Sequence, residues 1–190
     1  SQIASPGVFR NMAGATLDVQ GDFNFTGNGL VENQAGGLFV KSAGAGTASV
    51  SPTLTNLGTV KVASGRLDLT GTFSNFSAGT LTGGTYDLQG ELSYVGGDVV
   101  TSEATVILDG PPAILTRSGG GDALASLATN GTSGSLMIEN GKTHTVGSLL
   151  ANNGIVVLGQ SAALTANSGY RQLAGETRLE EGSLASTAFI

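Results

Sequence analysis

Acidic side chains are the first residues of this sequence that could support chemistry. Hydrolysis or elimination on a polysaccharide needs two carboxylates, or a base together with Arg and Lys, gathered on one surface. The candidate acids are spread widely along the chain: Asp18, Asp22, Asp68, Asp87 and Glu91. Because none has the spacing of a catalytic pair, we assign no catalytic residue and expect a solvated, charged surface.

The single histidine, His144, adds little to a catalytic interpretation. It lies between Thr143 and Thr145, so strand alternation points it outward if the threonines face inward. A structural zinc site needs several Cys or His ligands, and the chain contains no cysteine. A Ser–His–Asp triad has no local sequence support either. The sequence therefore predicts an ordinary surface histidine, with no metal ion and no cofactor.

The composition describes a folded, weakly charged chain that is rich in glycine. Among the 190 residues, 31 are Gly and only 12 % are charged, and the mean hydropathy of +0.17 argues against disorder. Eight basic against fourteen acidic residues give a net charge of −6, which disfavours binding to nucleic acid. No apolar run approaches the roughly 18 residues of a membrane span, so we expect no membrane insertion.

A short cassette recurs in which two glycines bracket a segment of alternating residues. Alternation with period two is typical of a strand with one buried face. The clearest copy is Gly65-Arg66-Leu67-Asp68-Leu69-Thr70-Gly71. The copies occupy residues 21–27, 65–71, 90–96 and 141–147.

A second marker, a glycine that follows a polar turn, recurs at a nearly fixed interval. The neighbouring markers are 20 or 21 residues apart, except across the gap from Gly79 to Gly134. Three short strands with tight corners fit this interval, whereas helical crossovers need stretches of 10–15 residues that the sequence lacks. The pattern predicts an all-β, single-stranded parallel β-helix, right-handed by analogy with other parallel connections. The corner glycines are Gly37, Gly58, Gly79, Gly134, Gly154 and Gly175.

We expect about eight coils of about 21 residues, each with three short strands, stacked about 4.8 Å apart. The β-helix domain would span 14–190, and residues 1–13 would form an N-terminal cap or lead-in. The expected coils are 14–36, 37–57, 58–78, 79–103, 104–133, 134–153, 154–174 and 175–190. The predicted inward side chains are Leu17, Val19, Phe23, Phe25, Val60, Val62, Leu67, Leu69, Phe73, Leu92, Tyr94, Leu136, Ile138, Val156 and Leu158.

Four asparagines at or near one corner predict a structural ladder. Stacked Asn side chains can bond to one another along the axis of a stack of strands. The alternative is isolated asparagines in turns, since Asn tolerates left-handed geometry. The predicted ladder contains Asn33, Asn56, Asn75 and Asn153.

The coil at 104–133 is irregular because it is about 30 residues long. Within it, residues 123–128 are predicted to form a short helical turn capped by Asp122. Long loops on a solenoid often carry binding. An ordinary insertion, tolerated because added loop length costs little, is the favoured interpretation.

Two runs of the sequence resemble the repeats of a known protein type. They are residues 54–65 (LTNLGTVKVASG) and 79–90 (GTLTGGTYDLQG). They resemble repeats of secreted bacterial β-helix proteins of the autotransporter-passenger and filamentous-adhesin kind, over roughly residues 14–185. This resemblance implies an extracellular or bacterial cell-surface location, but no catalytic residue can be carried over from it.

The expected function is therefore structural or adhesive rather than enzymatic. The chain would be a rigid stalk, an adhesin segment or a filament subunit. Its expected partners are further coils of the same or a longer chain, other copies met end to end, and surface glycans. The alternative is a module that binds or degrades polysaccharide in a groove beside residues 109–134.

Overall fold

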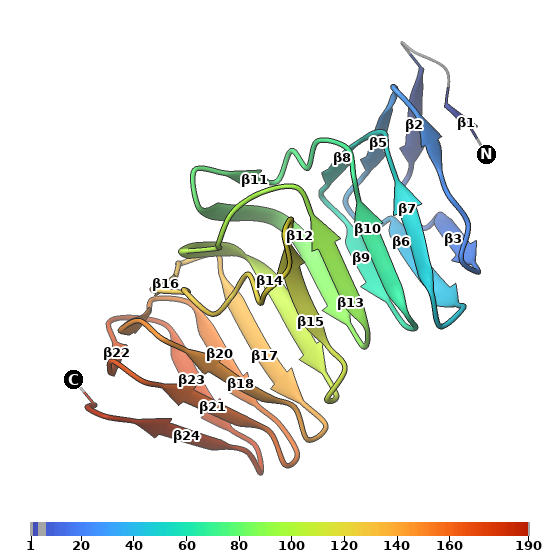
Figure 1. The fold of residues 1–190 in the computed structure, drawn as a ribbon. Coiled ribbons are helices and arrows are strands. Elements are labelled where there is room, and N and C mark those ends of the chain that lie inside the picture. The colour runs from blue at the N-terminus through green and yellow to red at the C-terminus, as the bar shows by residue number, and fades with distance from the viewer. Residues whose placement is uncertain (1, 4–6, 190) are drawn as a thin grey trace.

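The computed structural model describes residues 2–3 and 7–189 and shows a parallel β-solenoid of about eight coils (Figure 1). Equivalent strands recur about 22 residues apart, with three strands in each coil. The predicted all-β parallel β-helix is thus confirmed. No helix long and apolar enough to cross a membrane occurs in the described part of the chain.

One face of the solenoid, which we call the long face, runs through all the coils. Its neighbouring strands pair in parallel from first to last, which gives it a continuous backbone ladder. Its strands are β3 (Thr16–Gln20), β6 (Leu38–Ala43), β9 (Thr59–Val62), β12 (Thr80–Leu88), β14 (Thr101–Asp109), β17 (Ser135–Glu139), β20 (Ile155–Leu158) and β23 (Glu176–Leu179).

A second face, the split face, consists of two separate parallel sheets. The first contains β7 (Thr47–Val50), β10 (Arg66–Leu69), β13 (Glu91–Tyr94) and β15 (Ile114–Arg117), and the second contains β18 (Thr143–Val146), β21 (Ala163–Ala166) and β24 (Ser183–Ser186). Strands β15 and β18 do not pair. The segment 118–128, which we call the excursion, bonds to both sides: Ala123 N–H donates to Leu115 O, and Gly147 N–H donates to Ala125 O, each at 2.8 Å.

The third face carries the shortest strands. It begins with β2 (Val8–Asn11), β5 (Leu30–Asn33) and β8 (Thr53–Asn56), and continues through the first residues of β12 and β14 into β16 (Thr129–Asn130), β19 (Leu150–Asn152) and β22 (Tyr170–Gln172). Two short strands lie outside this scheme: β4 (Thr26–Gly27), which pairs with β1 (Gln2–Ile3), and β11 (Phe76–Ser77), which forms an antiparallel hairpin with β12.

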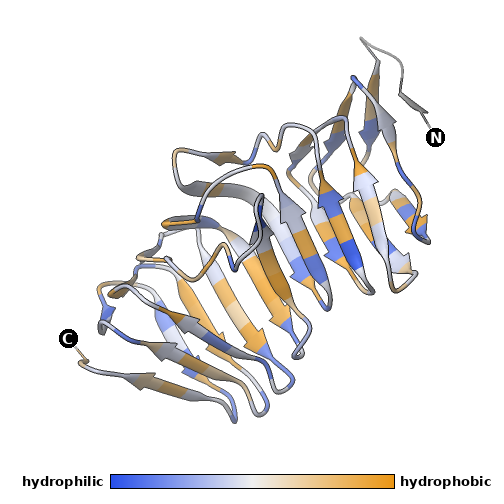
Figure 2. Cartoon of the chain, viewed as in Figure 1, coloured by the Kyte–Doolittle hydropathy of each residue, from blue (hydrophilic) through white to orange (hydrophobic). Residues whose placement is uncertain are grey.

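The interior is a continuous apolar column built from alternate residues of each strand. In β10, Leu67 and Leu69 are buried while Arg66 and Asp68 face outward, and Figure 2 shows the alternating hydropathy. Each fully buried Leu or Val stabilises the fold by about 1.5–3 kcal/mol relative to exposure. The predicted inward residues found buried are Val60, Val62, Leu67, Leu69, Phe73, Leu92, Tyr94, Leu136, Ile138, Val156 and Leu158.

The first coil departs from the predicted core. Leu17, Val19 and Phe25 are only partly buried against the core. The prediction for Phe23 is wrong, since its side chain is 69 % exposed. The cause is local: the chain bends around Asp22, so the first cassette does not form the regular strand seen in β10.

A column of glycines lies where the third face turns into the long face. The strand register superposes Gly37, Gly58, Gly84, Gly134, Gly154 and Gly175. A Cβ atom on Gly58 would lie 2.3 Å from the Gly37 carbonyl oxygen, and one on Gly154 would lie 2.1 Å from that of Gly134. The same carbonyls accept the N–H of the next coil, so glycine is required by close backbone approach.

Gly79 does not belong to this column, contrary to the prediction. It lies with φ of +79° at the turn of the β11–β12 hairpin, and Gly84 takes the column position. The inserted hairpin lengthens the third coil, so the fourth coil begins at residue 84 instead of 79. In the next coil, Ala104 occupies the same position.

The two irregular regions are integrated into the stack. Strand β2 pairs with β5, so described residues of the expected cap or lead-in form a strand of the solenoid; residues 1 and 4–6 lie outside the described residues. The predicted helical turn at 123–128 is wrong, because the segment forms turns. Asp122 Oδ1 nevertheless accepts the Leu124 N–H at 2.9 Å, as a cap would.

Substitution of a column glycine tests the close-approach argument. We expect Gly154→Ala to lower the free energy of unfolding by about 2 kcal/mol, because the methyl group overlaps a carbonyl that cannot move freely. Gly97→Ala is the control, since a Cβ atom at that position would meet nothing within 4 Å, and it should change stability by less than about 0.5 kcal/mol. Equal stabilities in urea unfolding would contradict the argument.

Candidate functional site

The most regular polar feature is a buried ladder of carboxamides beside the glycine column. Asn11 Nδ2 donates to Asn33 Oδ1 at 2.8 Å, and Asn33 Nδ2 donates to Asn56 Oδ1 at 2.8 Å. Each amide also donates to a backbone carbonyl of the next coil, as Asn33 does to Thr59 O at 3.0 Å. All three side chains are nearly inaccessible, so their hydrogen bonds hold coils together and present nothing to a ligand.

The ladder reappears in the later coils at positions that differ from those predicted. Asn130 Nδ2 donates to Asn152 Oδ1 at 2.7 Å, and Asn152 Nδ2 donates to Gln172 Oε1 at 3.2 Å. The predicted Asn153 is displaced by one residue: Asn152 points inward, and alternation turns Asn153 away. Asn75 joins from the hairpin, accepting the Asn56 N–H at 2.7 Å.

Lys41 forms a buried polar centre that the sequence pattern did not reveal. Its side chain is fully buried, and Nζ donates to Asp22 Oδ1 at 3.0 Å, Ala43 O at 2.6 Å and Gly44 O at 2.9 Å. The hydrogen bond from Lys41 lowers the pKa of Asp22. With three acceptors the ammonium group is saturated, so it ties the corner at Gly44 to the first coil.

His144 is buried, so the prediction of a surface histidine is wrong. Thr143 and Thr145 face solvent, and this reverses the expected alternation. The side chain of His144 is 2 % exposed, and Nδ1 lies 3.3 Å from Asp122 Oδ2. Nε2 is buried without a hydrogen-bond partner in the described structure. The pair therefore links the excursion to β18 across the break in the split face.

A shallow groove lies at the corner between the long and split faces, beside the start of the segment 109–134. Its lining includes Arg66, Gln89, Glu91 and Pro112. Arg66 NH1 lies 3.0 Å from Glu91 Oε1, and the same oxygen accepts the Thr116 hydroxyl at 2.7 Å. Glu91 is thus already satisfied by its neighbours, which leaves the groove without a free carboxylate pair.

The outer surface of the long face carries acids close to one another. Gln89 and Asn140 donate to Asp109 at 2.6 and 2.5 Å, and the Asn140 hydrogen bond is the main cause of its lowered pKa. Burial, and then the negative charge of Asp109, raises the pKa of Glu139. Within the described residues, no group of three or more His, Cys, Asp or Glu side chains is placed to hold a metal ion.

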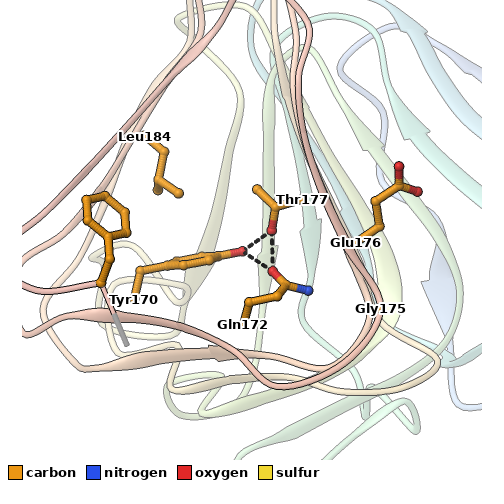
Figure 3. A pocket seen from close by; sticks show the side chains of 7 residues that line it. Tyr170, Gln172, Gly175, Glu176, Thr177 and Leu184 are labelled. Atoms are coloured by element: carbon orange, nitrogen blue, oxygen red, sulfur yellow. Dashed lines mark hydrogen bonds between the residues drawn. The ribbon is translucent and has the colours of Figure 1, made fainter.

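The last coil leaves a cavity that opens along the solenoid axis (Figure 3). Leu184 and Phe189 form its apolar wall. The Tyr170 hydroxyl contacts both the Thr177 hydroxyl and Gln172 Oε1, the latter at 3.3 Å, while Thr177 donates to Gln172 at 2.5 Å. These polar groups satisfy one another and stand where the next coil of a stack would cover them.

Removing one rung of the ladder tests its contribution. We expect Asn33→Ala to lower the free energy of unfolding by about 2 kcal/mol, because the buried groups of Asn11, Asn56 and Thr59 lose their partner. Asn153→Ala is the matched control, since no side-chain hydrogen bond of Asn153 is found among the described residues. A similar decrease in the free energy of unfolding in both variants would contradict a special role for the ladder.

The Asp122–His144 contact predicts a dependence of stability on pH. Burial acts to raise the pKa of Asp122, but the hydrogen bond and charge of His144, together with the Leu124 N–H and the charge of Lys142, lower this pKa below its ordinary value. Because the pKa of Asp122 is lower in the folded chain than in the unfolded chain, its carboxylate stabilises the fold at pH values above about 4, the pKa of the unfolded state. This stabilisation is lost as the pH falls below that value. Asp122→Asn should therefore be less stable than the parent chain by about 1 kcal/mol at pH 7.

The measurement is the difference in unfolding free energy between parent and Asp122→Asn, followed from pH 7 to pH 3. The difference should shrink as the pH falls below about 4. A difference that stays constant over this range would rule out an energetic role for the carboxylate charge.

The buried polar side chains of this chain thus act on the chain itself. Asn33, Lys41 and the half-buried Asp122 each join different coils or corners, and the half-buried Glu91 has its partners in place. Comparison with protein-family models, curated proteins and solved structures finds no match. The function therefore has to be argued from the geometry.

Proposed function

We propose that this chain is a non-enzymatic, rigid structural segment, serving as a spacer or adhesive stalk. The observation that carries the proposal is the unbroken parallel ladder of the long face, from β3 to β23. Every coil is hydrogen-bonded to the next along this face. Bending the rod so that the coils separate on the long face would therefore break several hydrogen bonds at once. Stiffness of this kind suits a spacer.

The filled interior supports the same role. The rings of Phe73 and Tyr86 pack edge to face at 5.7 Å between centroids, and Tyr94 lies 5.6 Å from Phe73. Fully buried Phe39 and Leu92 continue the column. Close packing gives such an interior low compressibility, so the coils resist being flattened as well as separated.

The proposed setting is extracellular, on or near a bacterial surface. It rests on the resemblance of residues 54–65 and 79–90 to secreted bacterial β-helix repeats. In that setting the stalk would meet further coils of its own or a longer chain, together with surface glycans.

Polysaccharide binding or cleavage is the second candidate, and the corner groove favours it. The groove lies beside the start of the 109–134 segment and presents Arg66, Gln89 and Glu91 along several coils. A glycan lying there would contact several stacked corners at once. The ion pair of Arg66 with Glu91 has to open before either group can act on a sugar.

Incubation with acidic and neutral polysaccharides separates the two candidates. We expect no cleavage products, because Glu91 is held by Arg66 and Thr116 instead of being poised as an acid or base. Product release that is lost in Glu91→Gln, with the fold intact by circular dichroism, would establish the enzymatic alternative.

Hydrogen exchange tests the rigidity of the rod. Amides of β9, β12, β14 and β17 should exchange only by global unfolding, since both of their edges are paired. Amides at Gly119 and Gly120 should exchange at least a hundredfold faster, because only turn contacts hold them. Fast exchange along the long face would contradict the proposed stiffness.

A further inference from the structure

The outer surface of the long face carries apolar side chains where strand alternation would place polar ones. In β9 the outward residues are Thr59 and Lys61. At the position that corresponds to Lys61, strands β14, β17 and β20 have Ile107, Met137 and Val157, which the register stacks in one row. Strands β14 and β20 are accordingly coloured hydrophobic along much of their length in Figure 2. We call these three residues the apolar row.

The apolar row forms a flat surface over three adjacent coils. Ile107 and Met137 are half-buried, and Val157 is 4 % exposed, so these side chains make a floor instead of projecting singly. Ile155, at the neighbouring outward position of β20, widens the surface with a side chain that is 38 % exposed. Contiguous apolar groups on an outer face mark an interaction surface, whereas scattered single ones do not.

Two acids border the apolar row along one side. Asp109 and Glu139 are partners in the register of β14 and β17 and take the outward position that follows the row. Among the described residues, neither forms an ion pair, and the nearby Lys61 is already paired with Asp87 at 2.6 Å. Burial, and then the charges of Asp109, Asp87 and Glu180, raise the pKa of Glu139. We call Asp109 and Glu139 the acidic edge.

We propose that the outer surface of β14, β17 and β20 docks a cationic amphipathic helix of a partner protein. The helix would lie along the rod, with its apolar stripe on the apolar row and its Lys or Arg side chains on the acidic edge. The proposal goes beyond the structural role proposed above and does not depend on it.

The spacing of the coils favours a helix over an extended strand as the occupant. The apolar row repeats about every 4.8 Å, and a helix presents one apolar side chain per turn, about every 5.4 Å. Over three coils the mismatch is roughly 1 Å, which flexible side chains can absorb. A strand laid in the same direction presents equivalent side chains about 6.7 Å apart, so its mismatch is roughly 4 Å.

The charge pattern favours a basic occupant over a second copy of this chain. The apolar row and the acidic edge are two residues apart along each strand, or roughly 7 Å, within reach of a long basic side chain on the flank of the helix. A second copy would bring its own Asp109 and Glu139 and a net charge of −6. Like charges oppose such a pairing, whereas ammonium or guanidinium groups would pair with the carboxylates.

A synthetic helical peptide of about 15 residues tests the proposal, since shorter isolated helices are unstable. The peptide carries Leu along one stripe and Lys along one flank, and its charge-reversed form carries Glu in place of Lys. In a fluorescence anisotropy titration with the full chain, we expect the Glu peptide to bind at least tenfold more weakly than the Lys peptide. Raising NaCl to about 0.5 M should weaken binding of the Lys peptide, because exposed charges are screened.

Two matched pairs of variants locate the binding surface. Glu139→Lys should lower the association constant of the Lys peptide about tenfold, because repulsion replaces attraction. Asp18→Lys makes the same change in net charge on the exposed first coil of the long face, and it should stay within about twofold of the parent. Met137→Ser should lower the constant about fivefold through lost apolar contact. Met12→Ser removes the other methionine of the chain, which is 58 % exposed, and should leave binding unchanged.

Equal binding of the two peptides, or no binding of either, would overturn the proposal. Losses in Asp18→Lys and Met12→Ser as large as those in Glu139→Lys and Met137→Ser would do the same, provided that circular dichroism shows all four variants folded. Dimerisation of the chain in sedimentation velocity, abolished by Met137→Ser while neither peptide binds, would assign the surface to a second copy instead. These outcomes are distinct from failure of the structural role, which hydrogen exchange and polysaccharide digestion measure.

Discussion

The spacing between coils is the constraint on which the whole structure depends. Backbone ladders hold neighbouring coils about 4.8 Å apart, and this leaves no space for a side chain wherever the chain crosses directly over a carbonyl. Gly58 and Gly154 meet this requirement by having no Cβ atom. The carbonyls that turn inward at the corner also need hydrogen-bond donors, and the side-chain amides of Asn33 and Asn152 supply them.

The same constraint explains why buried polar groups such as Asn33 and Lys41 find their partners within the chain. A coil of about 22 residues has a narrow interior, so any polar group inside must find its partner in an adjacent coil or corner. Lys41 does so with three oxygens, and His144 does so with Asp122 on one nitrogen. Chemistry directed at a partner is therefore left to the outer faces, the corner groove and the ends.

Repeated local patterns make the fold predictable from the sequence. Where the chain departs from the repeat, the positions of individual residues cannot be predicted in the same way. The cassette at 65–71 shows the two-residue alternation within a strand. The spacing from Gly37 to Gly58 shows the length of one coil. The pattern misplaces Gly79, which follows Gly58 by 21 residues but lies at the turn of the inserted hairpin. The residue that stacks on Gly58 is Gly84. The sequence alone does not distinguish those two glycines.

Side-chain direction near corners is the harder problem. His144 faces inward because β18 borders the excursion, whose Asp122 supplies a partner that no local pattern could assign. Ladder asparagines precede the column glycine by four residues at Asn33 and Asn130 but by two at Asn56 and Asn152, so a fixed offset finds only some of them. A search for amides 22 or 23 residues apart would have found Asn11 and Asn130.

The break in the split face shows how the solenoid accommodates irregularity without losing its axis. Between β15 and β18 the strand ladder is absent, yet the long face is continuous there through β14 and β17. The excursion fills the break with Ala123, Leu124 and Leu127, all buried in the core. One continuous face therefore fixes the direction of the rod, and the remaining faces are free to carry insertions.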